Sequence, residues 1–140
     1  MIRKNQLLPC SLRRDGLKQP CKSVLVVDDD RAILRTFTRI LQRAGFSTET
    51  AENGKEALVK IRTRTYDVAL IDMILGDSNG LDLLPKIEEC SPKTVMIIIT
   101  GADSTEKRSE ASKNGADAYL TKPVNPETLL NVFQEKLKFN

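Results

Sequence analysis

Three consecutive aspartates, Asp28, Asp29 and Asp30, follow the first apolar run of the chain, residues 24–27. Neighbouring carboxylates repel one another, and burying one of them without a partner is unfavourable. A helix N-cap explains one such aspartate but not three, so the pattern favours a cation site where the buried segment ends. The chain has no His, and the triplet has no Cys near it, so oxygen ligands favour Mg²⁺ or Ca²⁺ over zinc.

Length and composition are typical of one globular domain. The chain has 140 residues, of which 40% are hydrophobic and 29% charged. Its longest apolar run, residues 95–99, is too short to cross a bilayer, and no signal peptide is recognisable. The three cysteines lack metal-ligand spacing, which predicts reduced thiols. We therefore expect a cytoplasmic protein without a membrane partner.

The basic residues are concentrated at the N-terminus. Residues 1–22 contain six basic residues and one acidic residue, a net charge of +5, whereas the whole chain carries +3. A basic arm can contact nucleic acid or an anionic membrane, but this one has two prolines, no aromatic residue and no periodic apolar face. We therefore predict that residues 1–22 form a disordered extension, that residues 23–140 form the domain, and that nucleic acid is not bound directly.

From residue 23 onward, apolar strands alternate with helices. The pattern predicts strands at 24–27, 46–50, 67–72, 94–100 and 117–121, and helices from 30 or 31 to 44 and at 55–62, 81–90, 104–113 and 126–139. Residues 75–80 are expected to form a loop. In the first helix, the expected inward face is Ile33, Phe37, Ile40, Leu41 and Ala44. Five such units predict an α/β fold with a doubly wound parallel sheet.

Four of the predicted strands end at, or are directly followed by, a carboxylate, hydroxyl or ammonium side chain. Asp28 and Asp29 follow the first strand, Asp72 ends the third, Thr100 ends the fourth and Lys122 follows the fifth. Ligands of such sheets bind outside the carboxyl ends of the strands. Carboxylates can hold Mg²⁺ or accept a phosphoryl group, while an ammonium and a hydroxyl can bind phosphoryl oxygens. This set of residues predicts phosphoryl transfer.

These residues resemble the response-regulator receiver domain of two-component signalling over residues 23–137. The resemblance rests on Val-Val-Asp-Asp at 26–29, Ile-Asp at 71–72, Ile-Thr-Gly at 99–101 and Tyr-Leu-Thr-Lys-Pro at 119–123. It implies a flavodoxin-like sheet with strand order 2-1-3-4-5 and Asp72 as phosphoacceptor. It also implies an Mg²⁺ site formed by Asp29, by Asp28 mainly through water, by Asp72 and by the backbone carbonyl of Ile74. Asp30 is then expected to start the helix.

The family further implies a conformational switch. Thr100 is expected to move toward the phosphoryl group and Tyr119 to turn inward, although Tyr119 can also be an ordinary strand aromatic. The face formed by residues 104–113, 117–121 and 126–139 then changes its affinity for a separate output protein, or for a second copy of the chain. The implied phosphodonor is a sensor histidine kinase or phosphotransfer protein. Lys122–Pro123 is expected to be cis.

Two positions near the acceptor bear on loop rigidity and on phosphoryl lifetime. Gly76 stands where the family commonly has proline, which predicts a more mobile loop. Ile74 and Ala102, two residues past the acceptor and the switch threonine, cannot orient a water molecule through their side chains. A long-lived aspartyl-phosphate is therefore expected.

Two alternatives belong to other functional classes. Asp28-x-Asp30, Thr100 and Lys122 superficially fit a small phosphatase of the haloacid-dehalogenase type, but that assignment leaves Asp72 without a role. A pseudo-receiver scaffold would not need the five site residues that are present. The favoured prediction is a signalling phosphoacceptor, not an enzyme beyond its own phosphoryl transfer and slow autodephosphorylation.

Overall fold

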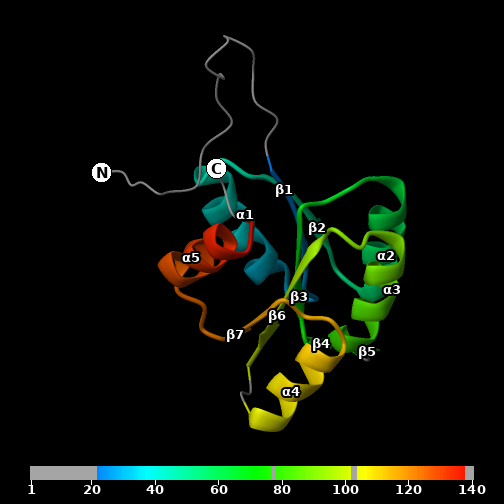
Figure 1. Ribbon diagram of the computed structural model, residues 1–140. Helices are drawn as coiled ribbons and strands as arrows, with labels where there is room; N and C mark the ends of the chain where they lie inside the picture. Colours follow the sequence, from blue (N-terminus) through cyan, green and yellow to red (C-terminus); the bar gives the residue numbers. More distant parts are fainter. Residues whose placement is uncertain (1–21, 77, 102–103, 138–140) are drawn as a thin grey trace.

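A five-stranded parallel sheet forms the centre of the molecule in the computed structural model, which describes residues 22–76, 78–101 and 104–137 (Figure 1). Its strands lie in the order β2-β1-β3-β6-β7. They are β1 (Ser23–Val27), β2 (Ser47–Ala51), β3 (Val68–Asp72), β6 (Val95–Thr100) and β7 (Ala118–Thr121). In chain order this is 2-1-3-4-5, so the predicted doubly wound sheet is confirmed. The predicted disorder of residues 1–21, the position of Ala102 and the predicted helical residues 138–139 lie outside the described residues.

Helices cover both faces of the sheet. One face packs against α1 (Arg31–Arg43) and α5 (Pro126–Leu137), and the other against α2 (Gly54–Thr63), α3 (Leu83–Cys90) and α4 (Thr105–Lys113). Successive residues of a strand point to opposite faces, so β1 divides its side chains between the two cores. Val24 and Val26 join the α1–α5 core, whereas Leu25 and Val27 join the other. A strand covered on both sides must be apolar throughout, which is why 24–27 reads as an unbroken hydrophobic run.

The buried face of α1 differs from the prediction, which is correct only for Phe37 and Leu41. Leu34, Phe37 and Leu41 are buried, whereas Ile33, Ile40 and Ala44 are only partly buried at its margin. Leu34 was not among the predicted inward residues. The helix is rotated so that its 34–37–41 row faces the sheet, and this rotation is set by contact with α5 and the strands rather than by local periodicity.

The described residues of the segment after β3, residues 74–76 and 78–82, form more regular structure than a simple loop. Ile74–Leu75 (β4) and Ser78–Asn79 (β5) pair as a short antiparallel hairpin, and a 3₁₀ turn, η1 (Gly80–Asp82), precedes α3. Gly76 follows β4 with a φ of 65°, a value that proline cannot adopt because its ring holds φ near −65°. The predicted loop at 75–80 is therefore partly wrong, and the greater mobility predicted for it stays a prediction.

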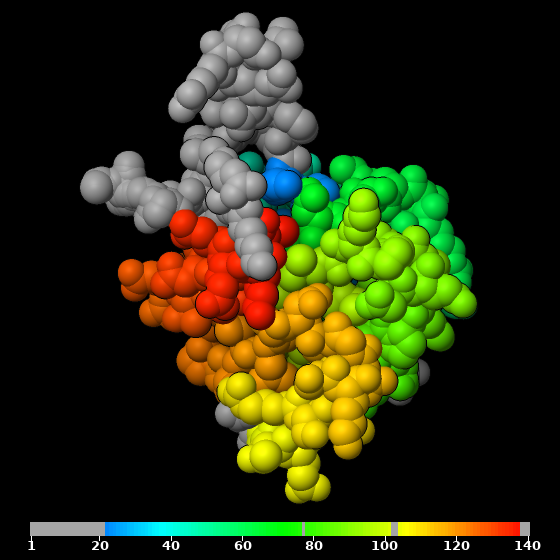
Figure 2. Space-filling model, viewed as in Figure 1, coloured from blue at the N-terminus to red at the C-terminus, as the bar shows by residue number. Residues whose placement is uncertain are grey.

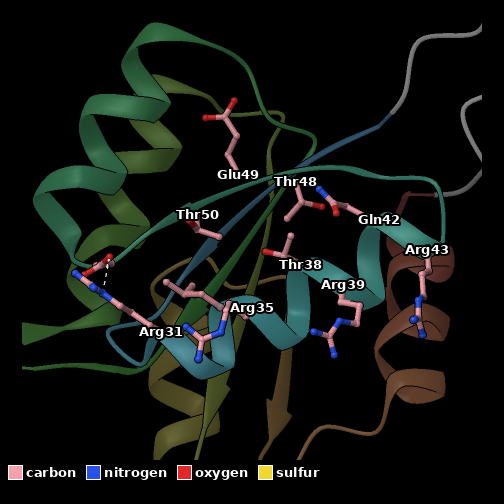
Figure 3. A pocket seen from close by; sticks show the side chains of 11 residues that line it. Arg31, Arg35, Thr38, Arg39, Gln42, Arg43, Thr48, Glu49 and Thr50 are labelled. Atoms are coloured by element: carbon pink, nitrogen blue, oxygen red, sulfur yellow. Dashed lines mark ion pairs between the residues drawn. The ribbon is translucent and has the colours of Figure 1, made fainter.

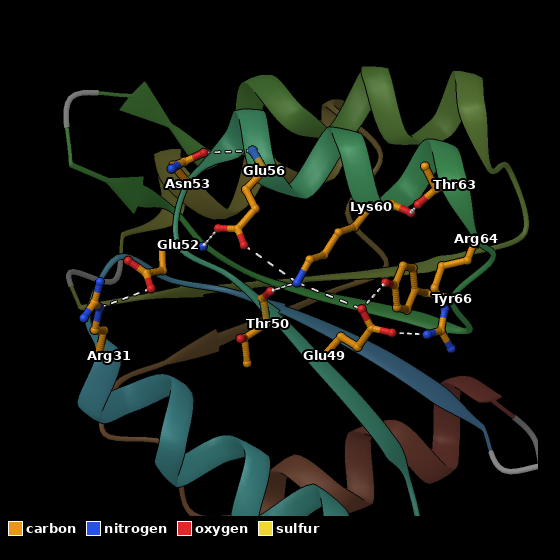
Figure 4. A network of polar contacts seen from close by, with 10 residues as sticks. All are labelled: Arg31, Glu49, Thr50, Glu52, Asn53, Glu56, Lys60, Thr63, Arg64 and Tyr66. Carbon is orange, nitrogen blue, oxygen red and sulfur yellow. Dashed lines mark hydrogen bonds and ion pairs between the residues drawn. The ribbon is translucent and has the colours of Figure 1, made fainter.

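The edge strand β2 is polar and is held to α2 by a network of charged groups (Figure 4). Lys60 Nζ donates to the Thr50 carbonyl at 2.5 Å and lies 3.7 Å from Glu56 and 4.0 Å from Glu49. Glu49 also pairs with Arg64 and accepts from the Tyr66 hydroxyl. Lys60 therefore satisfies the Thr50 carbonyl, which points away from β1 at the edge of the sheet. This hydrogen bond blocks a position where another strand could pair.

None of the helices in the described part of the chain combines the length and hydrophobicity needed to cross a bilayer.

Candidate functional site

The predicted site residues converge at the carboxyl edge of the sheet. Asp28 directly follows β1, Asp72 and Thr100 are the last residues of β3 and β6, and Lys122 directly follows β7. Strands β1 and β3 are neighbours, and the chain leaves them toward opposite faces of the sheet, to α1 and to α3. This reversal is the position at which open α/β sheets bind ligands.

Three carboxylates form a compact oxygen cluster at this edge. Asp28, Asp29 and Asp72 each contribute an oxygen, and these oxygens lie within 4.8 Å of one another. Asp28 and Asp72 are buried, at 3% and 8% exposure, while Asp29 is exposed. Oxygen ligands at this separation, without His or Cys, fit a hard divalent ion such as Mg²⁺ or Ca²⁺. The geometry is therefore suited to the predicted Mg²⁺.

Lys122 bridges the two buried carboxylates. Its Nζ lies 3.3 Å from Asp72 Oδ2 and 3.4 Å from Asp28 Oδ2. Its backbone amide donates to the Thr100 carbonyl at 2.7 Å, and the Lys122–Pro123 peptide bond is cis, as predicted. The cluster thus combines three carboxylates with one ammonium, which contacts two of them, so the site retains negative charge that a cation can neutralise.

The site perturbs the protonation of these groups. Burial raises the pKa of Asp28, and the Asp72 carboxylate adds to this, while the Asp30 amide and Lys122 oppose it. Burial also raises the pKa of Asp72, with Lys122 again opposing. For Lys122, burial lowers the pKa, but the carboxylates of Asp72 and Asp28 outweigh it and the pKa is raised. The carboxylates are held together against their own repulsion, as ligand-binding carboxylates are.

Asp30 is separate from the oxygen cluster. Its side chain accepts a hydrogen bond from the Ala32 amide at 2.9 Å and caps α1. Its own amide donates to Asp28 Oδ1 at 2.9 Å, which holds the Asp28 carboxylate in place. The prediction that Asp30 starts the helix is confirmed.

The backbone around Asp72 is tightly packed. The Ile74 amide lies 3.4 Å from Asp72 Oδ1, and the Gly80 amide donates to the Met73 carbonyl at 2.5 Å. A Cβ at Gly80 would lie 2.1 Å from the Asp72 carbonyl oxygen. The sequence did not single out Gly80. The feature of the sequence that could have indicated Gly80 is the dipeptide Asn79-Gly80, which follows the strand of Asp72. By itself such a dipeptide indicates only a turn. The role of the Ile74 carbonyl as a metal ligand stays a prediction.

The two predicted switch residues lie on neighbouring strands. Thr100 is buried at 1% exposure, and Tyr119 is half-buried on β7. The Arg108 guanidinium of α4 lies 4.6 Å from the centroid of the Tyr119 ring. The Tyr119 hydroxyl is buried and has no hydrogen-bond partner among the described residues. The inward turn of Tyr119 and the movement of Thr100 stay predictions.

Fold and site define a doubly wound α/β domain with an acidic site at the carboxyl edge of its sheet, and comparison with known families assigns it to a family. Residues 24–134 match the family model described as the response regulator receiver domain. The chain therefore belongs to the response regulator receiver domain family, whose members are signalling proteins. This confirms the resemblance drawn from the sequence motifs and leaves the phosphatase alternative without support.

Individual proteins similar to this chain are also response regulators or receiver domains. The chain is 39% identical over 131 residues to the acid tolerance regulatory protein ActR of Sinorhizobium medicae, covering 93% of this chain and 68% of ActR. A CheY-like receiver domain from Methanospirillum hungatei is 40% identical with a TM-score of 0.81, covering 85% of this chain and 95% of that one. A Burkholderia pseudomallei response regulator, solved with a phosphorylated aspartic acid, calcium ion and citrate, is 32% identical with a TM-score of 0.78, covering 84% and 69%.

The match does not extend over whole relatives. The chain spans between 24% and 68% of the length of the curated relatives first found. The activities of those longer proteins therefore do not transfer directly to this chain.

Proposed function

We propose that Asp72 accepts a phosphoryl group from a phosphohistidine of a sensor kinase or phosphotransfer protein, and that phosphorylation regulates a separate partner. The observation that carries the proposal is the buried Asp72 carboxylate, with the Lys122 ammonium at 3.3 Å and the Asp28 and Asp29 oxygens within 4.8 Å. An ammonium at this distance, and a hard cation held by the neighbouring carboxylates, would neutralise the charge of an acyl phosphate formed on Asp72.

Asp72 is better placed than Asp28 to act as the nucleophile. Asp28 Oδ1 is engaged by the Asp30 amide at 2.9 Å, whereas Asp72 Oδ1 has only a long contact of 3.4 Å from the Ile74 amide. Asp28 is also the more buried of the two. A carboxylate oxygen held by a short hydrogen bond is the weaker nucleophile. We therefore assign the metal-binding role to Asp28 and the nucleophilic attack to Asp72.

The transfer itself is a displacement at phosphorus. An Asp72 oxygen bonds to phosphorus while the phosphorus–nitrogen bond of the donor breaks, and the electron pair remains on the imidazole. In this proposal Lys122 neutralises charge on a phosphoryl oxygen, and the Thr100 hydroxyl donates to another. Asp28, Asp29 and Asp72 would hold an Mg²⁺ ion, which would supply further neutralisation of charge on the phosphoryl oxygens.

A groove beside the site offers a docking surface for the phosphodonor. It has a volume of about 480 Å³ and lies between α1 and residues 122–124, with Ile33, Ile40 and Val124 among its lining residues. Lys122 itself lines this groove, so a protein seated there would cover the edge of the phosphorylation site. Apolar lining residues of this kind are typical of protein-binding surfaces.

The switch is proposed to act on the face formed by α4, β7 and α5. Helices α4 and α5 form neighbouring parts of one face of the molecule (Figure 2). Tyr119 and Arg108 lie within this face, so a movement of Tyr119 alters its surface and the population that binds a partner. The occupant is a separate output protein or, after phosphorylation, a second copy of the chain. We place this signalling in the cytoplasm.

Phosphoryl uptake from acetyl phosphate and Mg²⁺, followed by intact mass, tests the proposal. The wild-type chain should gain one phosphoryl group and Asp72→Asn should gain none. Asp82→Asn, an exposed aspartate outside the oxygen cluster, should behave as wild type. Continued labelling of Asp72→Asn would assign the nucleophile to another carboxylate. A wild-type chain that takes up no phosphate would favour the pseudo-receiver alternative.

A further inference from the structure

Helix α1 carries four arginines at four-residue intervals, Arg31, Arg35, Arg39 and Arg43. Residues spaced by four in a helix lie on the same face, one turn apart, with a rise of about 6 Å. Figure 3 shows these side chains following one another along the helix, beside the groove that separates it from β2. These four residues are called the arginine stripe below.

Most of the stripe is not neutralised within the fold. Arg31 pairs with Glu52 at 3.1 Å. In the part of the chain that the structure describes, Arg35, Arg39 and Arg43 have neither an ion pair nor a side-chain hydrogen bond. The other carboxylate on this side, Glu49, is engaged by Arg64 and Lys60 (Figure 4). Like charges at this spacing lower the stability of a helix. The stability of the fold therefore does not explain why α1 carries four arginines in a row.

Polar and charged residues make up most of the lining of the groove beside the stripe. The groove has a volume of about 770 Å³, and it is lined by the arginines, by Thr38, Gln42, Thr48 and Thr50, by the ion-paired carboxylates Glu49 and Glu52, and by Leu34. The Thr48 hydroxyl is buried and has no hydrogen-bond partner among the described residues. Guanidinium, hydroxyl and amide groups are the donors that proteins use to contact phosphate oxygens.

We propose that the arginine stripe binds the phosphate backbone of duplex nucleic acid. Arg35 to Arg43 span about 12 Å along α1, a length over which duplex DNA carries about seven phosphate charges. The groove has no aromatic lining residue, so it lacks the platform that stacks single-stranded bases. The exposed large apolar residues of the described chain, Val59 and Ile74, lie elsewhere, so the stripe lacks what a membrane-inserting surface needs.

The positive charge of the stripe extends along the whole of α1. A row of charges of this length favours an extended polyanion over a compact acidic group. The inference is independent of the proposed phosphorylation and replaces the expectation that the chain does not contact nucleic acid.

Binding through phosphates alone predicts a specific salt dependence. The affinity should be insensitive to base sequence, and the logarithm of the association constant should fall linearly with the logarithm of the salt concentration. Each phosphate contact contributes about 0.9 to that slope. Replacing Arg35, Arg39 and Arg43 should therefore make the slope shallower by about 2.7.

Fluorescence anisotropy of the full chain with a labelled 24-base-pair duplex of arbitrary sequence, over a series of salt concentrations, measures this slope. The test variant is Arg35→Gln/Arg39→Gln/Arg43→Gln. The control, Lys55→Gln/Arg62→Gln/Lys93→Gln, removes the same charge from exposed positions outside the groove. We expect weaker binding and a shallower slope for the test variant and a wild-type slope for the control. The melting temperature of the test variant should not fall, because removing like charges relieves repulsion in α1.

Three results would overturn the proposal. The first is an equal loss of slope in both triple variants, which would mean that only the net charge matters. The second is an unchanged slope in the test variant. The third is unchanged DNA binding in the test variant together with loss of binding to an acidic helical peptide or to phosphatidylserine vesicles, which would assign the stripe to that partner.

Discussion

Gly80 lies so close to Asp72 that an added Cβ would be 2.1 Å from the Asp72 carbonyl oxygen and 3.0 Å from the Ile71 side chain. The segment after β5 therefore passes directly over the backbone of the proposed phosphoacceptor. Only glycine allows this approach, because its hydrogen leaves room for the neighbouring carbonyl. The position of the Asp72 backbone thus depends on a residue eight positions further along the chain.

Gly80→Ala should both destabilise the fold and slow phosphoryl uptake. Inserting a methyl group into such a contact forces a backbone shift that costs about 1–3 kcal/mol, and the shift displaces Asp72 relative to Lys122. Urea unfolding and the rate of mass gain with acetyl phosphate measure the two effects. Gly101→Ala is the matched control, since an added Cβ there meets nothing within 4 Å, and it should change stability by less than about 0.5 kcal/mol. Equal behaviour of the two variants would contradict the prediction.

Mg²⁺ should raise the melting temperature, because a ligand that binds only the folded state stabilises it. At about one hundred times its dissociation constant the gain is about 2.7 kcal/mol. Asp29→Ala removes one oxygen of the cluster and should abolish the response. Asp30→Ala removes the α1 cap and should lower stability by about 0.5–2 kcal/mol while keeping the response to Mg²⁺. A melting temperature insensitive to Mg²⁺ at constant ionic strength would show that the metal assignment is wrong.

The aspartyl-phosphate should be lost faster when Ile74 is replaced by Asn. Ile74 lies two residues past Asp72 and is 59% exposed, so its side chain is free to face water that approaches the phosphoryl group. An amide can orient that water, and a hydrogen bond worth about 1 kcal/mol in the transition state corresponds to about a fivefold faster loss. Phosphate loss after removal of the donor measures the lifetime. Val59→Asn, at the other exposed large apolar residue, should leave it unchanged, and equal rates in all three proteins would refute the role of Ile74.

Tyr66→Phe should reduce stability at neutral pH but weaken its decline at high pH. The Tyr66 hydroxyl donates to Glu49 at 3.1 Å, and loss of this bond costs about 1 kcal/mol. Burial raises the pKa of Tyr66 above its ordinary 10.0, with Arg64 opposing. Its neutral form is thus favoured in the folded state, and stability is lost as pH rises from 10.0 to the raised pKa. Unfolding free energies of both proteins across this range should converge, and parallel curves would contradict the prediction.

The sequence predicted the element order and the position of the site because these depend on local patterns, whereas the strand order followed from the family resemblance. Val24–Val27 is apolar on both faces, which in a chain of alternating strands and helices indicates a central parallel strand. Polar residues directly after such strands must then meet at one edge. The four-residue spacing from Arg31 to Arg43 is also visible in the sequence, but only the structure shows that three of these arginines have no ion-pair partner among the described residues.

Contacts between distant segments were not predictable in the same way. The inward rotation of α1 that buries Leu34, the hairpin that precedes Gly80, and the placement of Arg108 against Tyr119 each depend on the packing of elements far apart in the chain. No periodicity or turn signal encodes these distances.

The sequence by itself determined a parallel α/β domain with an acidic edge, because hydrophobic periodicity and the residues at strand ends are properties of short segments. Only the tertiary structure decided that the Lys122 ammonium lies between Asp28 and Asp72, 94 and 50 residues away along the chain. It also decided that Gly80 closes over Asp72. Side-chain spacing within one strand or helix is fixed by backbone geometry, whereas ångström distances across the sheet edge are fixed only when the two cores pack.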